Sequence, residues 1–260
     1  MTYQTKTVLV TVKAYPNPST KYRETVCVAG IDIDTGRWIR LYPIPFRDLD
    51  DKNKFTKYSI IEVRALKSPA DNRPESFKVV SSSISVLDRL DTRNNWDRRK
   101  CYLLPTISSS LCDILRENAT NDKSLGMFKP AKVAFRCNKV KPKKTPEKRD
   151  ACYAQFGLYA KNPDPIEAIP YDFRYNFYCH GEPECPGHDL PIIDWELMQS
   201  YRKWRYQYST EDILLEEIKK RWLDNMCSDS HDTFFFVGNM QRFKENFMVL
   251  GVFYPKKATG

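Results

Sequence analysis

The chain has 260 residues, and its 42 lysines and arginines outnumber its 33 aspartates and glutamates, which gives a net charge of +9. This length can bury one large core or two ordinary ones, and the charge favours an acidic partner such as nucleic acid, although a basic protein can also be merely soluble. No apolar run approaches the roughly 20 residues that span a bilayer, and the N-terminus lacks the order of a signal peptide. We therefore expect a cytoplasmic protein with no membrane partner, whose eight cysteines are reduced thiols or metal ligands.

The N-terminal part of the chain alternates short apolar runs with turn signals. Strands are predicted at residues 6–13, 25–31, 38–42, 58–66 and 77–87, and a short helix at residues 108–118. Asp34, Thr35 and Gly36 form a hairpin signal before the third of these strands. This spacing of strands and turns is typical of a β-barrel.

The predicted strand at residues 38–42 has two different faces. Ile39 and Leu41 alternate toward the expected core, and Trp38, Arg40 and Tyr42 alternate toward the other face. A row of aromatic and basic side chains can bind a single strand, because rings stack on bases and arginine contacts phosphate. The equally simple alternative is that Trp38 and Tyr42 are buried under a neighbouring segment.

Residues 129–149 carry nine basic side chains and one acidic side chain, and Pro142 and Pro146 prevent a continuous helix there. The first part of this run predicts a strand, and the rest predicts an exposed loop. Lys141, Lys143 and Lys144 in the loop are candidate phosphate contacts, although such runs are often only linkers. We expect the domain boundary nearby, with an N-terminal domain at residues 1–140 and a C-terminal domain at residues 141–260.

The C-terminal part begins with a predicted strand at residues 171–178, in which Tyr171, Phe173, Tyr175 and Phe177 fall on one face and Asp172, Arg174, Asn176 and Tyr178 on the other. A helical segment is predicted at residues 194–208, and a second helix, capped by Ser209, runs to Met226. Two apolar strands at residues 233–238 and 247–254 end the chain.

Between the strand and the first helix, a turn rich in glycine and proline contains Cys179, Cys185 and His188. Thiolate and imidazole are ligands that zinc prefers, and this turn can wrap three of them around one ion. Asp189, His231, another cysteine or water could complete the set. The alternative is two free cysteines and a turn histidine without metal. We expect a structural zinc, because two thiolates donate charge to the ion and acidify bound water less than three histidines would.

Asp194 and Glu196 follow the same turn and could belong to an acidic nuclease site, although an aspartate that caps the following helix is the simpler explanation. The phosphate-binding, dinucleotide-binding and hydrolase motifs G-x-x-x-x-G-K-[ST], G-x-G-x-x-G and G-x-S-x-G are all missing from the sequence. Those three classes of enzyme therefore have no support.

Four blocks of sequence extend over nearly the whole chain: VKAYPNPSTKYRETVCVAGIDIDTGRWIRLYPIPFR, DNRPES, YCHGEPECPGHDLPIIDWE and TFFFVGNMQRFKENFMVLGVFYP. In these blocks the chain resembles a family of bacterial dual OB domain-containing proteins that occur beside antiviral defence and other conflict systems. The resemblance implies two OB-like barrels, a Cys/His element in the second barrel, and a role in nucleic-acid or nucleotide recognition. It also implies a partner protein from the same defence system.

We therefore expect a mostly β (α+β) protein of two OB-like barrels with helical insertions, which binds single-stranded DNA or RNA in a bacterial defence system without being an enzyme. One alternative is a metal-dependent nuclease centred on residues 179–196, and another is a scaffold whose basic loop docks an acidic partner protein. The candidate nucleic-acid-binding residues are Trp38, Arg40, Tyr42, Arg47, Arg73, Arg98, Arg99, Lys141, Lys143, Lys144 and Arg174. The candidate zinc ligands are Cys179, Cys185 and His188.

Overall fold

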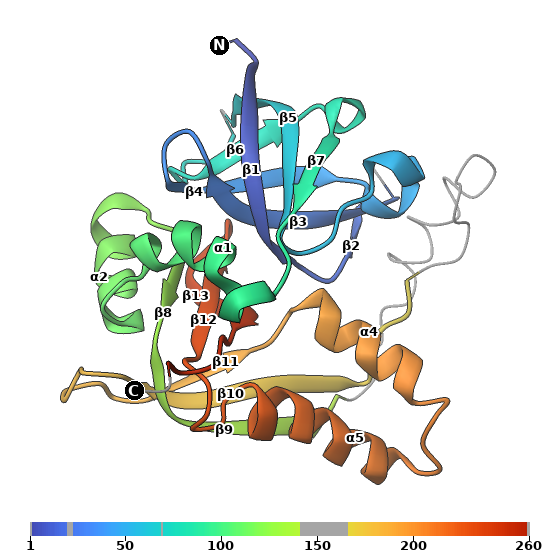
Figure 1. Cartoon of the computed structure of the whole chain (residues 1–260), viewed down its shortest axis with the longest axis vertical. Coiled ribbons are helices and arrows are strands. Elements are labelled where there is room, and N and C mark those ends of the chain that lie inside the picture. The colour runs from blue at the N-terminus through green and yellow to red at the C-terminus, as the bar shows by residue number, and fades with distance from the viewer. Residues whose placement is uncertain (1, 20–22, 69, 141–165, 259–260) are drawn as a thin grey trace.

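A computed structural model describes residues 2–19, 23–68, 70–140 and 166–258, and it is mostly β with a few helices (Figure 1). The sheets form two groups, one built from the N-terminal half of the chain and one from the C-terminal half. Within the described residues, no helix has the length and apolar character needed to cross a membrane.

The N-terminal half forms a closed five-stranded barrel. Its sheet runs in the order β1-β3-β4-β6-β5, and β5 returns to pair with β1. The strands are β1 (Gln4–Lys13), β2 (Asn17–Ser19), β3 (Arg23–Asp32), β4 (Arg37–Ile44), β5 (Ser59–Lys67), β6 (Ser76–Val79) and β7 (Ser85–Arg89). β2 pairs with β3, and β7 pairs with β5, at the margins of the barrel. Short 3-10 turns occur at Phe46–Asp48, Asp51–Asn53, Ser81–Ser83 and Leu104–Thr106.

Alternating apolar residues explain why these strands close into a barrel. Ile39 and Leu41 of β4 are buried in the same cluster as Val8 and Val10 of β1, which confirms the predicted core face of β4. Side chains alternate across a strand, so filling the interior from each strand requires this period of two.

The C-terminal half contains two three-stranded sheets and most of the helices. One sheet has the order β11-β10-β9, and the other has the order β13-β12-β8. The strands are β8 (Leu125–Phe128), β9 (Pro130–Lys139), β10 (Tyr171–Cys179), β11 (His188–Pro191), β12 (Phe234–Met240) and β13 (Phe243–Phe253). The helices are α1 (Arg93–Leu103), α2 (Leu111–Asn121), α4 (Trp195–Trp204), α5 (Glu211–Lys219) and the π-helical segment η5 (Lys220–Asn225).

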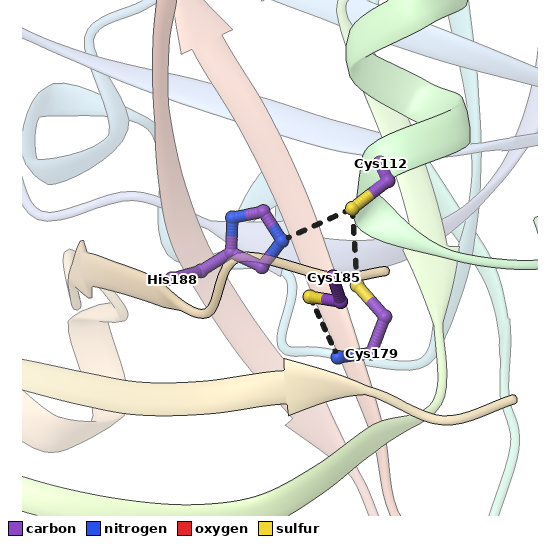
Figure 2. Close-up of side chains that lie close together, drawn as sticks. All are labelled: Cys112, Cys179, Cys185 and His188. Atoms are coloured by element: carbon purple, nitrogen blue, oxygen red, sulfur yellow. Dashed lines mark hydrogen bonds between the residues drawn. The ribbon is translucent and has the colours of Figure 1, made fainter. Parts of the chain in front are cut away.

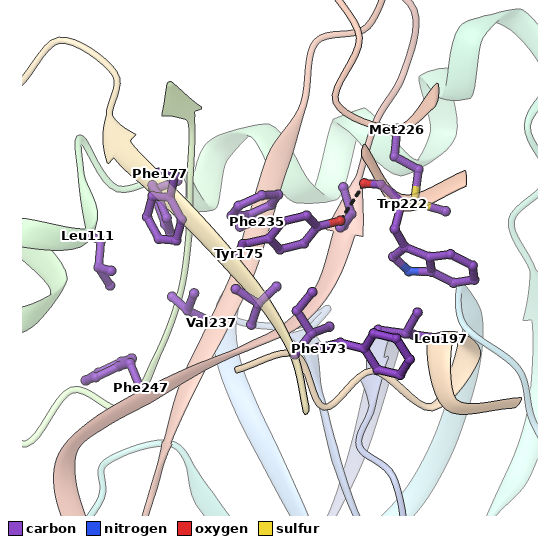
Figure 3. Packing of buried hydrophobic residues seen from close by; sticks show 14 of the residues in the cluster. Leu111, Phe173, Tyr175, Phe177, Leu197, Trp222, Met226, Phe235, Val237 and Phe247 are labelled. Carbon is purple, nitrogen blue, oxygen red and sulfur yellow. Dashed lines mark hydrogen bonds between the residues drawn. The ribbon is translucent and has the colours of Figure 1, made fainter. Parts of the chain in front are cut away.

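An aromatic core joins these two sheets to the helices (Figure 3). Phe173, Tyr175 and Phe177 of β10 are buried, and the Tyr175 ring stacks on Phe235 of β12 with centroids 4.6 Å apart. The Tyr175 hydroxyl donates to the carbonyl of Trp222 at 2.5 Å, so its buried polar end is satisfied. The strand predicted at residues 171–178 is therefore present, and the face that carries these aromatic residues is the buried one.

Most predicted strands are present, with ends shifted by a few residues. The prediction omitted α1, β8 and β11, and it assigned the cap of the last helix to Ser209. That assignment is wrong by one residue, because Thr210 is the cap and its hydroxyl accepts from the backbone N–H of Ile213. β8 and β9, which precede residue 140, pair with β12 and β10 of the C-terminal half.

A buried ion pair and an apolar layer hold the two halves together. Lys57, just before β5, places its Nζ 3.2 Å from Asp194 Oδ2 and 3.1 Å from Glu196 Oε2. Burial alone would lower the pKa of Lys57, but the two carboxylates raise it above its ordinary value. A Cβ atom added to Gly251 of β13 would lie 3.0 Å from Lys57 Nζ, so the small residue leaves room for the ion pair. Around it, Leu9 and Ile31 of the barrel pack with Phe236 and Leu250.

Replacing Lys57 with methionine should lower the free energy of unfolding by about 3–5 kcal/mol, because it leaves Asp194 as a buried carboxylate without its cation. Urea denaturation measures this loss. Lys54→Met is the matched control, because Lys54 pairs with the almost fully exposed Asp51. The control should change stability by less than about 1 kcal/mol. Equal effects of the two substitutions would show that the buried pair does not stabilise the junction.

Candidate metal centre

Four side chains that can bind a metal, from α2 and from the β10–β11 hairpin, meet beside the end of β10 (Figure 2). Cys179 ends β10, His188 begins β11, and Cys185 lies in the turn between these strands. Cys112 comes from the first turn of α2, 67 residues before Cys179. Together these residues form the Cys/His cluster.

The four ligand atoms are close enough to share one ion, since all lie within 4.8 Å of one another. Cys112 Sγ is 3.9 Å from Cys179 Sγ and 3.4 Å from His188 Nε2. The sulfur separation is far longer than a disulfide bond of about 2.05 Å, and the described cysteines are all free. The Cys/His cluster can therefore hold a metal ion.

Local chemistry shapes the turn that carries two of the ligands. Gly181 and Gly187 have φ angles of 74° and 81°, a region that favours glycine. Phe177 pairs with His188 across the β10–β11 hairpin, which fixes the histidine near the end of β10. The backbone N–H of Cys179 donates to Cys185 Sγ at 3.2 Å, so the turn folds back over the strand end.

The helix that carries Cys112 is fixed by its own cap and by a contact with the turn. Ser110 caps α2, accepting from the backbone N–H of Asp113 at 3.0 Å. The same hydroxyl donates to Glu182 Oε2 at 3.2 Å, which joins the start of α2 to the β10–β11 turn. The position of Cys112 thus follows from contacts that do not involve a metal.

The thiols of the Cys/His cluster differ in their readiness to ionise. Burial and, to a smaller extent, the neighbouring Cys179 raise the pKa of Cys112 to about 12. Burial also raises the pKa of Cys179. Burial alone would raise the pKa of Cys185 too, but backbone N–H groups of Cys179 and Gly187 lower it below its ordinary value. Burial lowers the pKa of His188, which keeps the imidazole neutral and able to bind a metal.

The Cys/His cluster contains the three ligands predicted from the sequence and adds Cys112. The sequence left the fourth ligand open among Asp189, His231, another cysteine and water. Asp189 pairs instead with Arg174 at 2.7 Å, and His231 bonds through Nδ1 to Ser228. Nothing in the sequence near Cys112 distinguishes it from the other cysteines, because only the tertiary fold brings α2 to the turn.

The predicted row on β4 lies against other parts of the protein. Trp38 packs edge-on against Phe236 of β12, with ring centroids 5.9 Å apart. Arg40 is buried and donates through Nη2 to the carbonyl of Ser124 at 2.9 Å. Tyr42 is about half exposed, and its hydroxyl accepts from Thr25.

The other predicted nucleic-acid contacts are distributed over the molecule. Arg47 pairs with Glu24, and Arg73 is buried with bonds to Asp71 and Asn239. Arg98 is exposed and pairs with Asp88.

Of the remaining five candidates, two have partners and three fall outside the described residues. Arg99 donates to the carbonyl of Leu90, and Arg174 pairs with Asp172 and Asp189. Lys141, Lys143 and Lys144 lie outside the described residues. The structure brings Arg40, Tyr42 and Arg73 around one cavity but does not gather the whole set on one surface.

Asp194 and Glu196, the centre of the nuclease alternative, are engaged within the protein. Asp194 caps α4, accepting from the backbone N–H of Glu196 at 2.9 Å, as the simpler interpretation predicted. Burial raises the pKa of Asp194 to about 6, and Lys57 opposes this effect. Because the ammonium of Lys57 lies between both carboxylates, the pair is not arranged to bind a catalytic cation.

Two family descriptions match the sequence. Residues 4–105 match "Domain of unknown function (DUF8758)", and residues 107–260 match "Domain of unknown function (DUF8757)". The second match covers more than half of the chain, including all four residues of the Cys/His cluster. No curated protein matches the chain.

Replacing Cys112 with serine should lower both the bound metal and the thermal stability. A link that closes a loop of this length contributes roughly 4 kcal/mol, so the melting temperature should fall by roughly 10 °C. Elemental analysis and calorimetry measure the two effects. Cys101→Ser is the matched control, because Cys101 is an exposed cysteine on α1. Full metal content in Cys112→Ser would remove this residue from the ligand set.

Proposed function

Because the chain belongs to the family described as "Domain of unknown function (DUF8757)", which names no activity, we propose a function from geometry. The protein binds single-stranded nucleic acid on the outer face of β9, β10 and β11, and a structural zinc ion supports that face. The observation that carries the proposal is the exposure of two basic side chains, Lys132 and Arg136, beside the exposed Tyr178 ring on this side of the sheet.

Strand order supports an OB-like topology for the N-terminal barrel. The order β1-β3-β4-β6-β5 places the last strand, β6, parallel to the third, β4, and returns β5 to β1. OB-folds are five-stranded Greek-key barrels, and oligonucleotides bind across their second and third strands.

We infer the same order for the C-terminal half from its strand pairings, and this order supports a second OB-like barrel. β8 and β9 follow each other directly and act as one bent strand, pairing with β12 at one end and β10 at the other. A parallel bridge between Ile192 and Val249 connects the end of β11 to β13. The implied order is β9-β10-β11-β13-β12-β8. Along the chain, α4 and α5 lie between β11 and β12.

The two halves differ in what covers the face of the second and third strands. On the N-terminal barrel, Ala29 and Ile31 of β3 are buried in the layer that contacts the C-terminal half, and Trp38 packs beside them. On the C-terminal half, β10 and β11 present their outer side together with β9. Lys132 and Arg136 on β9 and Tyr178 on β10 are exposed.

This outer face has the chemistry that single strands require. Arg174 pairs opposite Arg136 in the β9–β10 register, so two guanidinium groups share the surface. Lys132 Nζ lies 5.6 Å from the centre of the Tyr178 ring, which combines a cation with a stacking surface. Bases stack on aromatic rings, and cations contact the phosphates. The basic run at residues 129–149 begins on β9 and extends into the β9–β10 connection.

Zinc suits the Cys/His cluster because of donor type and spacing. A tetrahedral zinc with Zn–S bonds of about 2.3 Å and Zn–N bonds of about 2.0 Å places sulfurs roughly 3.8 Å apart and a sulfur roughly 3.5 Å from a nitrogen. The corresponding distances here are 3.9 Å and 3.4 Å. Four protein ligands leave no open position, so the zinc would tie α2 to the β10–β11 hairpin rather than catalyse a reaction.

Purified protein should contain one zinc ion per chain by elemental analysis. Its removal by a chelator should lower the melting temperature, because binding free energy at such sites is largely folding free energy. A stoichiometric amount of another metal would contradict the choice of zinc.

Replacing both Lys132 and Arg136 with glutamine should weaken binding to poly(dT) or poly(U) and flatten its salt dependence. Two lost phosphate contacts should reduce the slope of log affinity against log salt by about 1.4. Fluorescence anisotropy across a salt series gives this slope. Arg64→Gln with Lys78→Gln is the charge-matched control, since both residues are exposed on the N-terminal barrel.

The control pair should leave the slope at the parental value. A slope unchanged in the Lys132 and Arg136 variant would contradict this binding face. Salt-sensitive capture of an acidic protein, without retention of either nucleic acid, would contradict nucleic-acid binding itself and favour the scaffold function.

A further inference from the structure

A second set of cations and aromatic rings surrounds a cavity between the two halves of the chain. The cavity has a volume of about 650 Å³, within the range of small-molecule sites. Arg89, Trp96 and Arg99 line it from the N-terminal half, and Trp204 and Arg221 line it from the C-terminal half. No residue of the Cys/His cluster or of the proposed strand-binding face lines it, so the cavity is a separate site.

The charges that line the cavity are unbalanced. Lys57, Arg89, Arg99 and Arg221 are its cations, and Glu196 is its carboxylate. Lys57 and its two ion-pair partners, Asp194 and Glu196, together carry one net negative charge, which offsets one of the three arginine charges. Within the part of the chain that the structure describes, none of the three arginines forms an ion pair with a carboxylate. Three guanidinium groups therefore face one cavity without a carboxylate partner.

Neutral groups fix two of these guanidinium groups in place. Arg99 donates from Nε and Nη2 to the carbonyl of Leu90 at 3.0 and 2.7 Å, and it lies 3.9 Å from the centre of the Tyr58 ring. Arg221 donates from Nη2 to the hydroxyl of Tyr254 at 2.9 Å. These contacts orient the side chains without a direct ion pair, so the guanidinium groups can still bind an anion.

Two rings of the cavity wall sit on backbone in the left-handed region. The φ angles are 63° at Tyr58 and 66° at Trp96, and Asn94 and Asn95 precede Trp96 with φ angles of 49° and 52°. This conformation is unfavourable for residues other than glycine, and residues of this kind gather at ligand-binding sites. Both strained aromatic residues line the same cavity.

Two further features of the wall point to a ligand. The Tyr58 hydroxyl is buried and has no hydrogen-bond partner in the protein. A buried polar group without a partner is costly, and native proteins seldom keep one. Arg221 and Trp222 lie on the π-helical segment η5, and π-helical turns occur frequently at functional sites.

We propose that this cavity binds a nucleoside 5′-phosphate. A phosphate carries the double negative charge and the several acceptor oxygens that Arg89, Arg99 and Arg221 can share. A planar base matches the aromatic walls formed by Trp96 and Trp204. The nucleoside 5′-phosphate can be a free nucleotide or the first residue of a strand, because the recognised chemistry is the same.

Isothermal titration calorimetry with AMP, GMP, CMP and UMP tests the free form, and adenosine and inorganic phosphate are the partial ligands. At least one monophosphate should bind at least about tenfold more tightly than either partial ligand, because only the whole nucleotide reaches both the cations and the rings. Anisotropy with 5′-phosphorylated and 5′-hydroxyl oligonucleotides tests the strand end. A preference for the phosphorylated end supports that source.

Arg89→Gln with Arg221→Gln removes two exposed cations of the cavity and should leave the fold intact. The parent's preference for a monophosphate over the partial ligands, or for the phosphorylated over the hydroxyl strand end, should fall roughly 100-fold in this variant. Arg64→Gln with Arg242→Gln is the charge-matched control, since both residues are exposed and neither lines the cavity.

Three results would overturn the proposal. The first is a parent that distinguishes neither the monophosphates from their partial ligands nor the two strand ends. The second is inorganic phosphate binding as tightly as every nucleotide. The third is an equal loss of binding in the control variant. Strand binding through β9, β10 and β11 is tested with poly(dT) or poly(U) on the Lys132 and Arg136 variant, whereas this proposal is tested with free nucleotides and strand ends on the Arg89 and Arg221 variant, so the two failures are distinguishable.

Discussion

The ion pair between Lys57 and Asp194 is the interaction on which the arrangement of the two halves depends. An ammonium group buried at this depth is stable only beside a carboxylate, and Asp194 supplies one while also capping α4. Gly251 leaves room for both groups, so β13 contributes to the same junction. Because each group is satisfied by an element from another part of the chain, sliding one half along the other would leave a buried charge unpaired.

A junction held in this way determines which surfaces remain available. It covers the outer side of β3 and β4 with residues of the C-terminal half, including Phe236 and Leu250. On the outer side of β9 and β10, Lys132, Arg136 and Tyr178 stay exposed, and a cavity lined by three arginines remains between the halves. The covered face of the N-terminal barrel, the exposed residues of the β9–β10 sheet and the cavity are therefore consequences of one packing arrangement.

Periodic and local signals in the sequence predicted much of the structure. The alternation of Phe173, Tyr175 and Phe177 identified β10 and its buried face, and the composition of the following turn identified three residues of the Cys/His cluster. Both signals lie within short stretches of chain. Cys112 could not be predicted, because its position depends on packing between segments 67 residues apart. The partners of Trp38 and Arg40 were hidden for the same reason, since a strand pattern does not reveal what covers its outer face.

The left-handed backbone at Trp96 was equally invisible, because tryptophan has no preference for that region and only the surrounding contacts hold it there. Asn95 exchanges two hydrogen bonds of 2.8 Å with the backbone of Lys256, and the Trp96 ring packs against Phe253 and Tyr254. These contacts all reach the end of the C-terminal half. A strained turn persists only where its surroundings determine it more strongly than its own preferences do. The junction therefore does more than join the two halves, since it also keeps the aromatic wall of the cavity in a conformation that the local sequence would not adopt.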